Sequence, residues 1–135
     1  WGYRLAMKRI KNDARSAGRV FEIDLEDFKT ISQLPCHYCG SPPSNVLTYK
    51  SNAGIFTREF IYTGMDRVDN SIGYVLTNVV PCCIICNRAK NNMPYDDFIA
   101  WIARLSERNI HGISKEKKRQ TDRPGAPVLE PAHSR

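Results

Sequence analysis

The spacing of apolar positions predicts two helices near the start of the chain. Across residues 1–20, apolar side chains recur every three or four positions with polar ones opposite, as in an amphipathic helix. A second apolar series at helical spacing follows Asp24, an aspartate suited to an N-cap, and Pro35 ends it. The apolar residues of this second helix are Leu25, Phe28 and Ile31.

The pattern changes in the middle of the chain. Residues 46–64 are rich in β-branched and aromatic side chains on both sides of a turn at Ser51–Gly54, which predicts two paired strands. Further on, Pro94 suits the first position of a helix and Gly112 its end. The face of this helix that we expect to be buried consists of Phe98, Trp101, Ile102 and Leu105. Residues 113–135 are rich in charge and proline, which predicts a disordered basic tail.

Charge is distributed unevenly along the 135 residues, whose net charge is +6. Residues 1–20 carry six Lys or Arg and one acid, and residues from 101 onward carry eight bases and four acids. Basic clusters at both ends predict a polyanionic partner, for which nucleic acid is the leading candidate; the alternative is an ordinary solvated surface. No apolar run approaches the ~18–20 residues that a membrane span needs, and nothing resembles a signal peptide.

Five basic residues of the first helix recur at spacings of four, three, four and four, which aligns them in one stripe. They are Arg4, Lys8, Lys11, Arg15 and Arg19. We expect this stripe to lie along DNA phosphates while the apolar side packs on the domain. An ordinary amphipathic surface helix is the alternative interpretation.

Two CxxC pairs, Cys36 with Cys39 and Cys83 with Cys86, are separated by 43 residues. Each pair offers two thiolates, and four thiolates in a tetrahedron are the preferred ligands of structural zinc. The alternatives are a redox pair or a buried cysteine pair, but a redox motif needs only one pair within a βαβ pattern. The odd count of five cysteines argues against a secreted disulfide framework and favours the reducing cytoplasm.

Two further residues beside these pairs are predicted not to bind the zinc. Three residues separate Cys82 from Cys86, instead of the two of a CxxC pair, so we expect Cys82 to be a small buried side chain. His37 lies inside the first pair and is a possible ligand, but with four cysteines at hand we expect it to be a bystander.

Oxygen-bearing side chains flank the cysteines. Asp66 follows a strand-like run, and Asn87 directly follows the second cysteine pair on a predicted helix. A zinc ion joining the two pairs would bring these segments together, and a hard divalent cation such as Mg²⁺ takes one or two such oxygens from a protein. Lys90, one helical turn beyond Asn87, is then within reach of a phosphate.

The segments "CHYCG", "MDRVDNSIGY" and "TNVVPCCIICNRAK" resemble the HNH endonucleases, in particular the phage and prokaryotic type with a four-cysteine zinc knuckle. The resemblance covers roughly residues 21–105. It implies an α+β fold with a ββα-metal core stapled by zinc, flanked by N- and C-terminal helices. Together with the apolar and charge pattern, it divides the chain into four segments: a basic helical region 1–35, the core 36–93, a packing helix 94–112 and the tail 113–135.

The resemblance also implies roles for three residues, carried over by position. Asp66 matches the aspartate that binds the divalent cation, and Asn87 matches the second ligand of that cation. Asn78 matches the central asparagine, which orders the loop through hydrogen bonds to the backbone.

The sequence departs from the family pattern at Arg67, where the family's general base is a histidine. Arginine does not accept a proton at neutral pH, although it can bind the scissile phosphate. An alignment shifted by one would instead place Asp66 at the histidine position. Three explanations remain: Asp69 or Asp66 is the base; a distant histidine reaches the site; or the site is degenerate and only binds DNA. The candidate histidines are His37, which the zinc holds nearby, and His111 and His133, which have no clear route.

The sequence therefore predicts a Mg²⁺- or Mn²⁺-dependent HNH-type endonuclease with one structural zinc. We expect it to nick double-stranded DNA through water activated by the metal, with Arg88 and the basic termini on the DNA backbone. The expected location is the cytoplasm, that of a bacterial host if a phage encodes the chain, and both a monomer and a dimer are open. The alternative is a non-catalytic zinc-ribbon DNA-binding protein.

Overall fold

The computed structural model describes residues 1–52, 54 and 56–121 of the chain. Its helices are α1 (Gly2–Ser16), α2 (Leu25–Ile31), the 3-10 turn η1 (Leu76–Asn78), α3 (Ile84–Lys90) and α4 (Tyr95–Thr121). Its strands are β1 (Asn45–Lys50), β2 (Thr57–Tyr62), β3 (Gly64–Arg67) and β4 (Val79–Cys82). The chain divides into two units, Trp1–Tyr95 and a second that begins at Asp96, and they are described separately.

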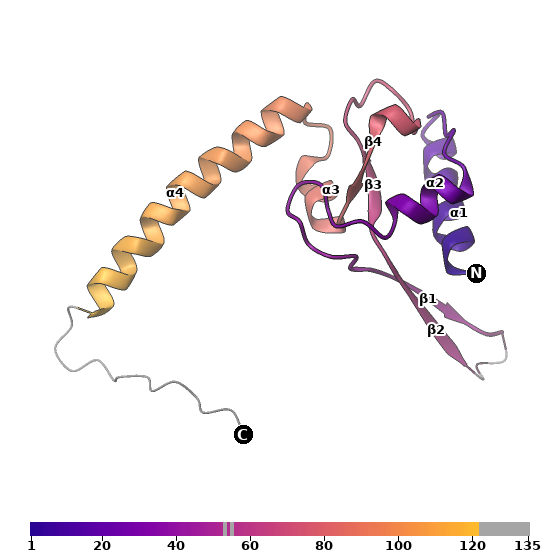
Figure 1. Cartoon of the computed structure of the whole chain (residues 1–135), viewed down its shortest axis with the longest axis horizontal. Coiled ribbons are helices and arrows are strands. Elements are labelled where there is room, and N and C mark those ends of the chain that lie inside the picture. Colours follow the sequence, from indigo (N-terminus) through magenta and orange to yellow (C-terminus); the bar gives the residue numbers. More distant parts are fainter. Residues whose placement is uncertain (53, 55, 122–135) are drawn as a thin grey trace. The chain divides into compact units, whose positions relative to one another are not determined.

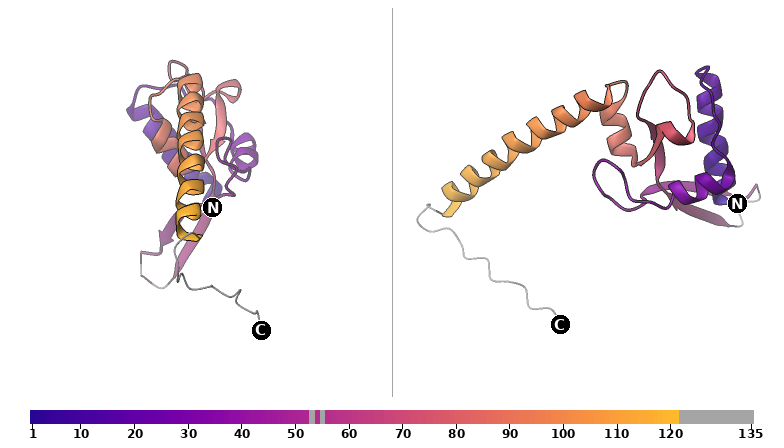
Figure 2. Two further views of the ribbon diagram at one scale, coloured as in Figure 1. Left: turned by 90° about the vertical axis from the view of Figure 1, so that its left-hand side faces the viewer. Right: turned by 45° about the horizontal axis from the view of Figure 1, so that its top comes forward.

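Two antiparallel ribbons form the sheet structure of the first unit. β1 pairs with β2, with Asn45 opposite Tyr62, and β3 pairs with β4, with Gly64 opposite Cys82. In Figures 1 and 2 the longer β1–β2 hairpin extends away from the β3–β4 ribbon. Only Thr63 separates β2 from β3; its backbone N–H donates to Ser32 O at 2.7 Å, and its hydroxyl donates to a second carbonyl of the α2–β1 segment. The two ribbons are therefore pinned to the segment after α2 at the point where they meet.

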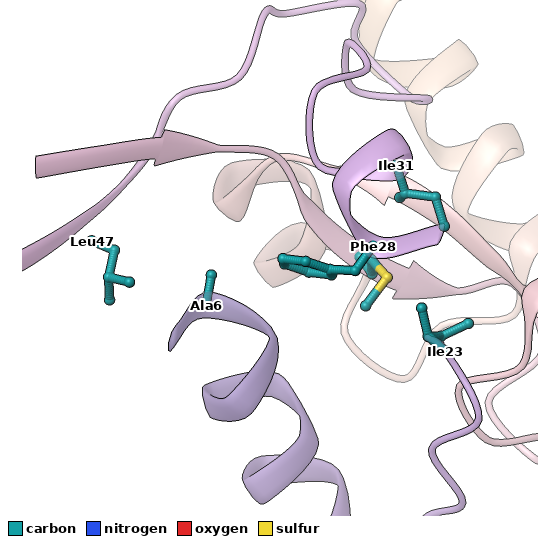
Figure 3. Packing of buried hydrophobic residues seen from close by; sticks show 6 residues of the cluster. Ala6, Ile23, Phe28, Ile31 and Leu47 are labelled. Atoms are coloured by element: carbon teal, nitrogen blue, oxygen red, sulfur yellow. The ribbon is translucent and has the colours of Figure 1, made fainter. Parts of the chain in front are cut away.

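A small apolar core joins both ribbons to the first two helices (Figure 3). Its fully buried members are Ala6, Ile23, Phe28, Ile31, Leu47 and Met65. The apolar stripes predicted for α1 and α2 supply three of them, and Asp24 caps α2 as predicted, accepting a hydrogen bond from Asp27 N at 2.8 Å. Burying these stripes holds α1 and α2 against the strands.

The order β3, β4, α3 gives a hairpin followed by a short helix. Cys83 is the N-cap of α3, and its sulfur accepts from Cys86 N. The predicted α+β class with a ββα arrangement is confirmed in this part of the chain.

The second unit contains most of α4, which runs to Thr121. The helix thus passes the predicted end at Gly112, because the residues after this glycine are mostly good helix formers. Phe98 is buried, but Leu105 is 42 % exposed, so the predicted buried face is too long. The tail predicted to be disordered begins at residue 113, but residues 113–121 belong to α4. Residues 122–135 lie outside the described residues, and the disorder predicted there stays a prediction, as does the division into four segments. No helix among the described residues is long and apolar enough to cross a membrane.

Candidate metal centre and active site

The four cysteines of the two CxxC pairs converge on one point. Their sulfur atoms all lie within 4.8 Å of one another, and Cys39 Sγ is 3.8 Å from Cys83 Sγ. Four bonds of about 2.3 Å in a tetrahedron place sulfur atoms roughly 3.8 Å apart, so the geometry fits a single zinc-sized ion. Gly40, with a φ of +71°, turns the chain back so that its N–H reaches Cys36 O at 2.8 Å. The predicted quartet is therefore positioned to bind one metal ion.

Position separates the four sulfur ligands from the two neighbouring residues Cys82 and His37. The hydroxyl and backbone N–H of Ser41 lower the pKa of Cys39 to about 6, which favours the thiolate that a metal needs. Burial raises the pKa of Cys82 and also that of the quartet member Cys86, so the pKa direction alone does not tell a ligand from a non-ligand. Cys82 lies outside the quartet, as does His37, whose Nε2 is 3.1 Å from Tyr95 Oη. Both residues are where the sequence predicted them, beside the cluster and not in it.

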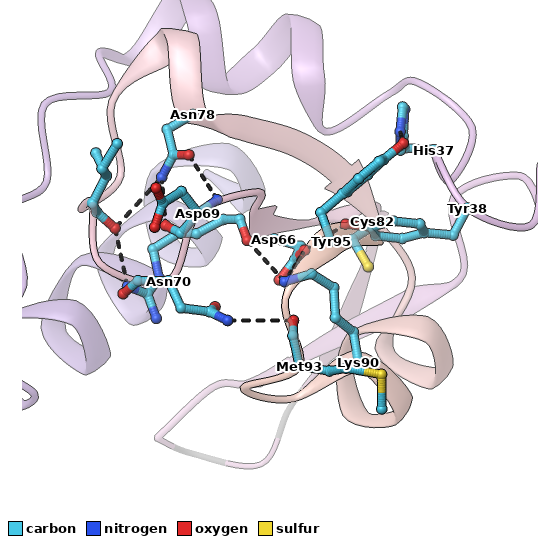
Figure 4. Close-up of polar contacts among 12 residues, drawn as sticks. His37, Tyr38, Asp66, Asp69, Asn70, Asn78, Cys82, Lys90, Met93 and Tyr95 are labelled. Carbon is cyan, nitrogen blue, oxygen red and sulfur yellow. Dashed lines mark hydrogen bonds and ion pairs between the residues drawn. The ribbon is translucent and has the colours of Figure 1, made fainter. Parts of the chain in front are cut away.

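Asp66 is the centre of a buried polar group on β3. It is 5 % exposed, and its Oδ2 accepts a hydrogen bond from Tyr38 Oη at 2.7 Å and pairs with Lys90 Nζ at 3.1 Å. Figure 4 shows Tyr38 and Lys90 converging on this carboxylate. Its Oδ1 has no hydrogen-bond partner among the described residues.

Lys90 has a different environment from the predicted one. Its side chain is fully buried, and besides the ion pair with Asp66 it donates to Arg67 O at 2.9 Å. Because α3 packs against β3, the ammonium group points into this interface. Lys90 is therefore paired with Asp66 in this structure, and its predicted contact with a phosphate stays a prediction.

Arg67 and Asn78 both hold the loop between β3 and η1. Arg67 Nη1 donates to Asn70 O at 2.7 Å and to Ile72 O at 3.0 Å. Asn78 is buried; its Oδ1 accepts from Asp69 N at 2.9 Å, and its Nδ2 donates to Asp69 O at 3.0 Å and to Gly73 O at 3.1 Å. These bonds are what the predicted loop-ordering role of Asn78 requires.

Asp69, one of the two predicted general bases, is turned into that loop. Its Oδ1 accepts from the Ser71 hydroxyl at 2.6 Å and from the Ser71 N–H at 2.8 Å. These bonds lower the pKa of the carboxyl, which makes it a weaker proton acceptor.

A pocket of about 280 Å³ opens beside Asp66. It is lined by Arg19, Asp66, Arg67, Asn70, Tyr74, Asn87, Arg88, Asn91 and Asn92. The two predicted cation ligands, one from β3 and one from α3, thus share a single pocket, and Asp66 is the one carboxylate in the described lining. Three arginines in the same lining make it attractive to an anion such as phosphate.

The predicted basic stripe divides between two places, because α1 ends at Ser16 and Arg19 lies beyond the helix. Arg19 lines the Asp66 pocket, whereas Arg4 and Lys8 line a separate groove against the β1–β2 hairpin. Lys11 Nζ lies 5.9 Å from the ring centroid of Phe21, and Arg15 is exposed. Of the predicted DNA-binding residues, only Arg19 and Arg88 lie at the candidate active site.

Several residues of the site were missed from the sequence. The pocket adds Asn70, Tyr74, Asn91 and Asn92, and Tyr38 contacts Asp66. Tyr38 stands between two cysteines of the predicted zinc cluster, so its closeness to the site was a signal available in the sequence. The others have no comparable signal, because only the folded loop and the end of α3 bring them together.

Comparisons with known proteins bear on this geometry. No family model matches the chain. It is 29 % identical over 91 residues to an uncharacterized protein of Acanthamoeba polyphaga mimivirus; the match covers 67 % of this chain but only 14 % of that protein. The solved structure of the HNH restriction endonuclease PacI, described for an extraordinary mechanism of DNA perturbation, is similar with a TM-score of 0.55 and 20 % identity, over 83 % of this chain and 81 % of that one. The chain therefore has an HNH-like fold, and the phage origin expected from the sequence stays a prediction.

Proposed function

We propose that the chain is a metal-dependent DNA endonuclease that hydrolyses phosphodiester bonds at the pocket between β3 and α3. The observation that carries the proposal is the shared pocket of Asp66 and Asn87, lined also by arginines. A carboxylate and an amide oxygen suit a hard divalent cation, and arginines suit the phosphate that it bridges. The HNH-like fold supports this assignment.

The residues present fit a Mg²⁺ or Mn²⁺ ion. Tyr38 and Lys90 both contact Oδ2 of Asp66, so they fix the carboxylate and leave Oδ1 to face a ligand. The side-chain oxygen of Asn87 is the second protein ligand, and such ions take the rest of their ligands from water and phosphate. A divalent cation held here supplies charge stabilisation to the phosphate and acidifies water.

Asp66 is also the residue best placed to accept a proton. It is the one carboxylate in the described lining of the pocket, whereas Asp69 is held by Ser71 in the loop and has a lowered pKa. His37 is engaged with Tyr95 outside the lining. The side chain of His111 and all of His133 lie outside the described residues. We therefore assign proton acceptance to Asp66, and loop order to Asp69.

The two exposed arginines of the pocket bind the substrate in this account. Arg19 follows α1 and Arg88 lies on α3, so they reach the pocket from separate elements. Guanidinium groups pair with phosphate oxygens through two parallel hydrogen bonds. Arg19 and Arg88 thus orient the DNA backbone of a duplex, and one site per chain makes a nick the smallest product.

The cysteine quartet holds a zinc ion in this proposal. Four thiolates at the observed spacing suit zinc better than the harder cations, which prefer oxygen. The ion closes the knuckle that carries Tyr38 and so keeps the phenol against Asp66. Its role is structural and not chemical.

Nicking of supercoiled plasmid tests the function. With Mg²⁺ or Mn²⁺ the wild type is expected to produce open circles, and with EDTA none. Asp66→Asn is expected to lose nicking and Asn87→Ala to lose it or to need more of the metal, whereas Asp97→Asn and Asn109→Ala, matched changes at exposed positions of α4, are expected to behave like the wild type. Circular dichroism of all four variants shows whether each is folded.

The competing function is DNA binding without cleavage. It is favoured by one observation, the buried ion pair that already neutralises Asp66. Retarded migration of DNA together with no nicking in any divalent metal would establish it and would remove the endonuclease proposal.

A further inference from the structure

A second, larger hollow lies between α1 and the β1–β2 hairpin. It has a volume of about 540 Å³ and is lined by Trp1, Arg4, Leu5, Lys8, Tyr49, Phe56 and Arg58. It shares no lining residue with the pocket of Asp66. Three aromatic rings and three cations make up six of the seven described lining residues, and none of these seven is acidic. We call this hollow the aromatic groove.

The strand register places these side chains on one face of the hairpin. Tyr49 lies directly opposite Arg58, so both side chains are on the same face of the ribbon. Leu47, two residues before Tyr49, is buried in the core on that face. Glu59 is opposite Thr48 and therefore belongs to the other face. The alternation of β2 thus presents its arginine to the groove and turns its acid away.

The aromatic rings of the groove are exposed although they form a cluster. Tyr49 is 40 % exposed and Phe56 is 45 % exposed. The ring of Tyr49 lies 5.6 Å from that of Trp1 and 6.4 Å from that of Phe56, and the guanidinium of Arg58 lies 5.0 Å from the Phe56 centroid. A cluster of exposed aromatic side chains in a hollow is typical of a binding surface.

We propose that the aromatic groove binds an unpaired nucleotide of a DNA strand. The base stacks on Tyr49 or Phe56, and the flanking phosphates pair with Lys8 and Arg58. Aromatic platforms beside cations are the arrangement by which proteins bind single strands, because every base has a π-face and every linkage a negative charge. A small anion alone would not account for the aromatic side chains. An apolar protein segment would not account for the three cations.

The N-terminal segment contributes cations both to this groove and to the candidate active site. Arg4 and Lys8 of α1 line the groove, and Arg19, which follows the end of α1, lines the pocket of Asp66. A strand held at the groove can therefore follow cations to the pocket. The inference rests on the proposed function for the identity of the strand as DNA, and it makes DNA with an unpaired segment the preferred substrate.

Binding of a fluorescein-labelled oligothymidylate to the full chain with its zinc, followed by anisotropy, tests the groove. The double variant Tyr49→Ala/Phe56→Ala is expected to weaken binding about five-fold or more, the loss typical of one stacked base. The same double variant is expected to change binding of a blunt duplex by less than about two-fold, because a duplex offers phosphates but no unpaired base to stack. Ile61→Ala is the control, because Ile61 is 53 % exposed on the opposite face of the same ribbon.

A second readout follows the ring of Trp1 directly. In a Trp101→Phe variant Trp1 is the one remaining tryptophan of the two, and the oligothymidylate is expected to quench its fluorescence. An unquenched signal at saturating oligonucleotide overturns the proposal. The proposal is also overturned if Lys8→Gln and Arg58→Gln weaken binding but the double aromatic variant does not. That result would mean that charge attraction alone binds the strand. Tighter binding of the matching RNA strand overturns the assignment to DNA.

The outcome separates this inference from the proposed function. Asp66→Asn is expected to abolish nicking and leave oligothymidylate binding unchanged. Stacking-dependent binding in a protein that never nicks DNA leaves the groove in place and removes the endonuclease. Nicking without stacking-dependent binding keeps the endonuclease proposal and removes the proposed role of the aromatic groove.

Discussion

The hydroxyl of Tyr38 donates a 2.7 Å hydrogen bond to Oδ2 of Asp66, a residue 28 positions away along the chain. Tyr38 stands between Cys36 and Cys39 of the metal-binding quartet. One side chain therefore connects the proposed zinc site with the proposed catalytic carboxylate. If the cysteines lose their metal and become disordered, we expect Tyr38 to move and Asp66 to lose this hydrogen bond.

Tyr38→Phe removes the hydroxyl and keeps the ring. A hydrogen bond to a charged group contributes about 1.5–3 kcal/mol, so we expect a lower melting temperature and a nicking rate reduced by roughly ten-fold. Tyr95→Phe is the control, because it breaks the contact with His37 and leaves Asp66 untouched. Equal nicking by wild type and Tyr38→Phe would show that the bond does not position Asp66.

Metal analysis of natively purified protein is expected to give about one zinc per chain, as one four-thiolate site requires. Cys39→Ala is expected to lose the zinc, to unfold at lower temperature and to lose nicking. Cys82→Ala keeps all four sulfur ligands and is expected to keep the zinc. Wild-type protein purified without any zinc would refute the assignment of the quartet.

Lys90→Met leaves the carboxylate of Asp66 buried without its cation. Breaking a buried ion pair by removing one partner costs about 3–5 kcal/mol, which urea unfolding measures. The double variant Asp66→Asn/Lys90→Met is expected to be less destabilised than the sum of the single variants. Strict additivity would mean that the 3.1 Å ion pair contributes no coupling energy.

Asp69→Asn tests which carboxylate accepts the proton. The new amide oxygen still accepts from Ser71, so the loop is expected to stay ordered and the nicking rate to remain within about three-fold, the range of effects that a non-participating surface residue shows. A loss of a hundred-fold or more in a folded variant would move the role of base from Asp66 to Asp69.

Much of the scaffold could be predicted because its signals are local. The cap at Asp24 and the CxxC spacing act within a few residues, and both correspond to the structure. The apolar pattern did not predict the strand β3, because its four residues are all buried and show no alternation; only the family resemblance implied a hairpin there. The sequence placed Lys90 on a helix one turn after Asn87. It did not show that α3 packs against β3 so that the ammonium group of Lys90 is buried there. The bond from Tyr38 to Asp66 depends on long-range folding in the same way.

The most direct measurement of the central claim is the Mn²⁺ concentration that gives half-maximal nicking of supercoiled plasmid. If Asp66 and Asn87 hold the cation, Asn87→Ala is expected to need at least about ten-fold more Mn²⁺, as loss of one ligand implies, or to show no nicking at all. Asn109→Ala is expected to match the wild type. The same Mn²⁺ requirement and the same maximal rate in folded Asn87→Ala would contradict the proposed metal site.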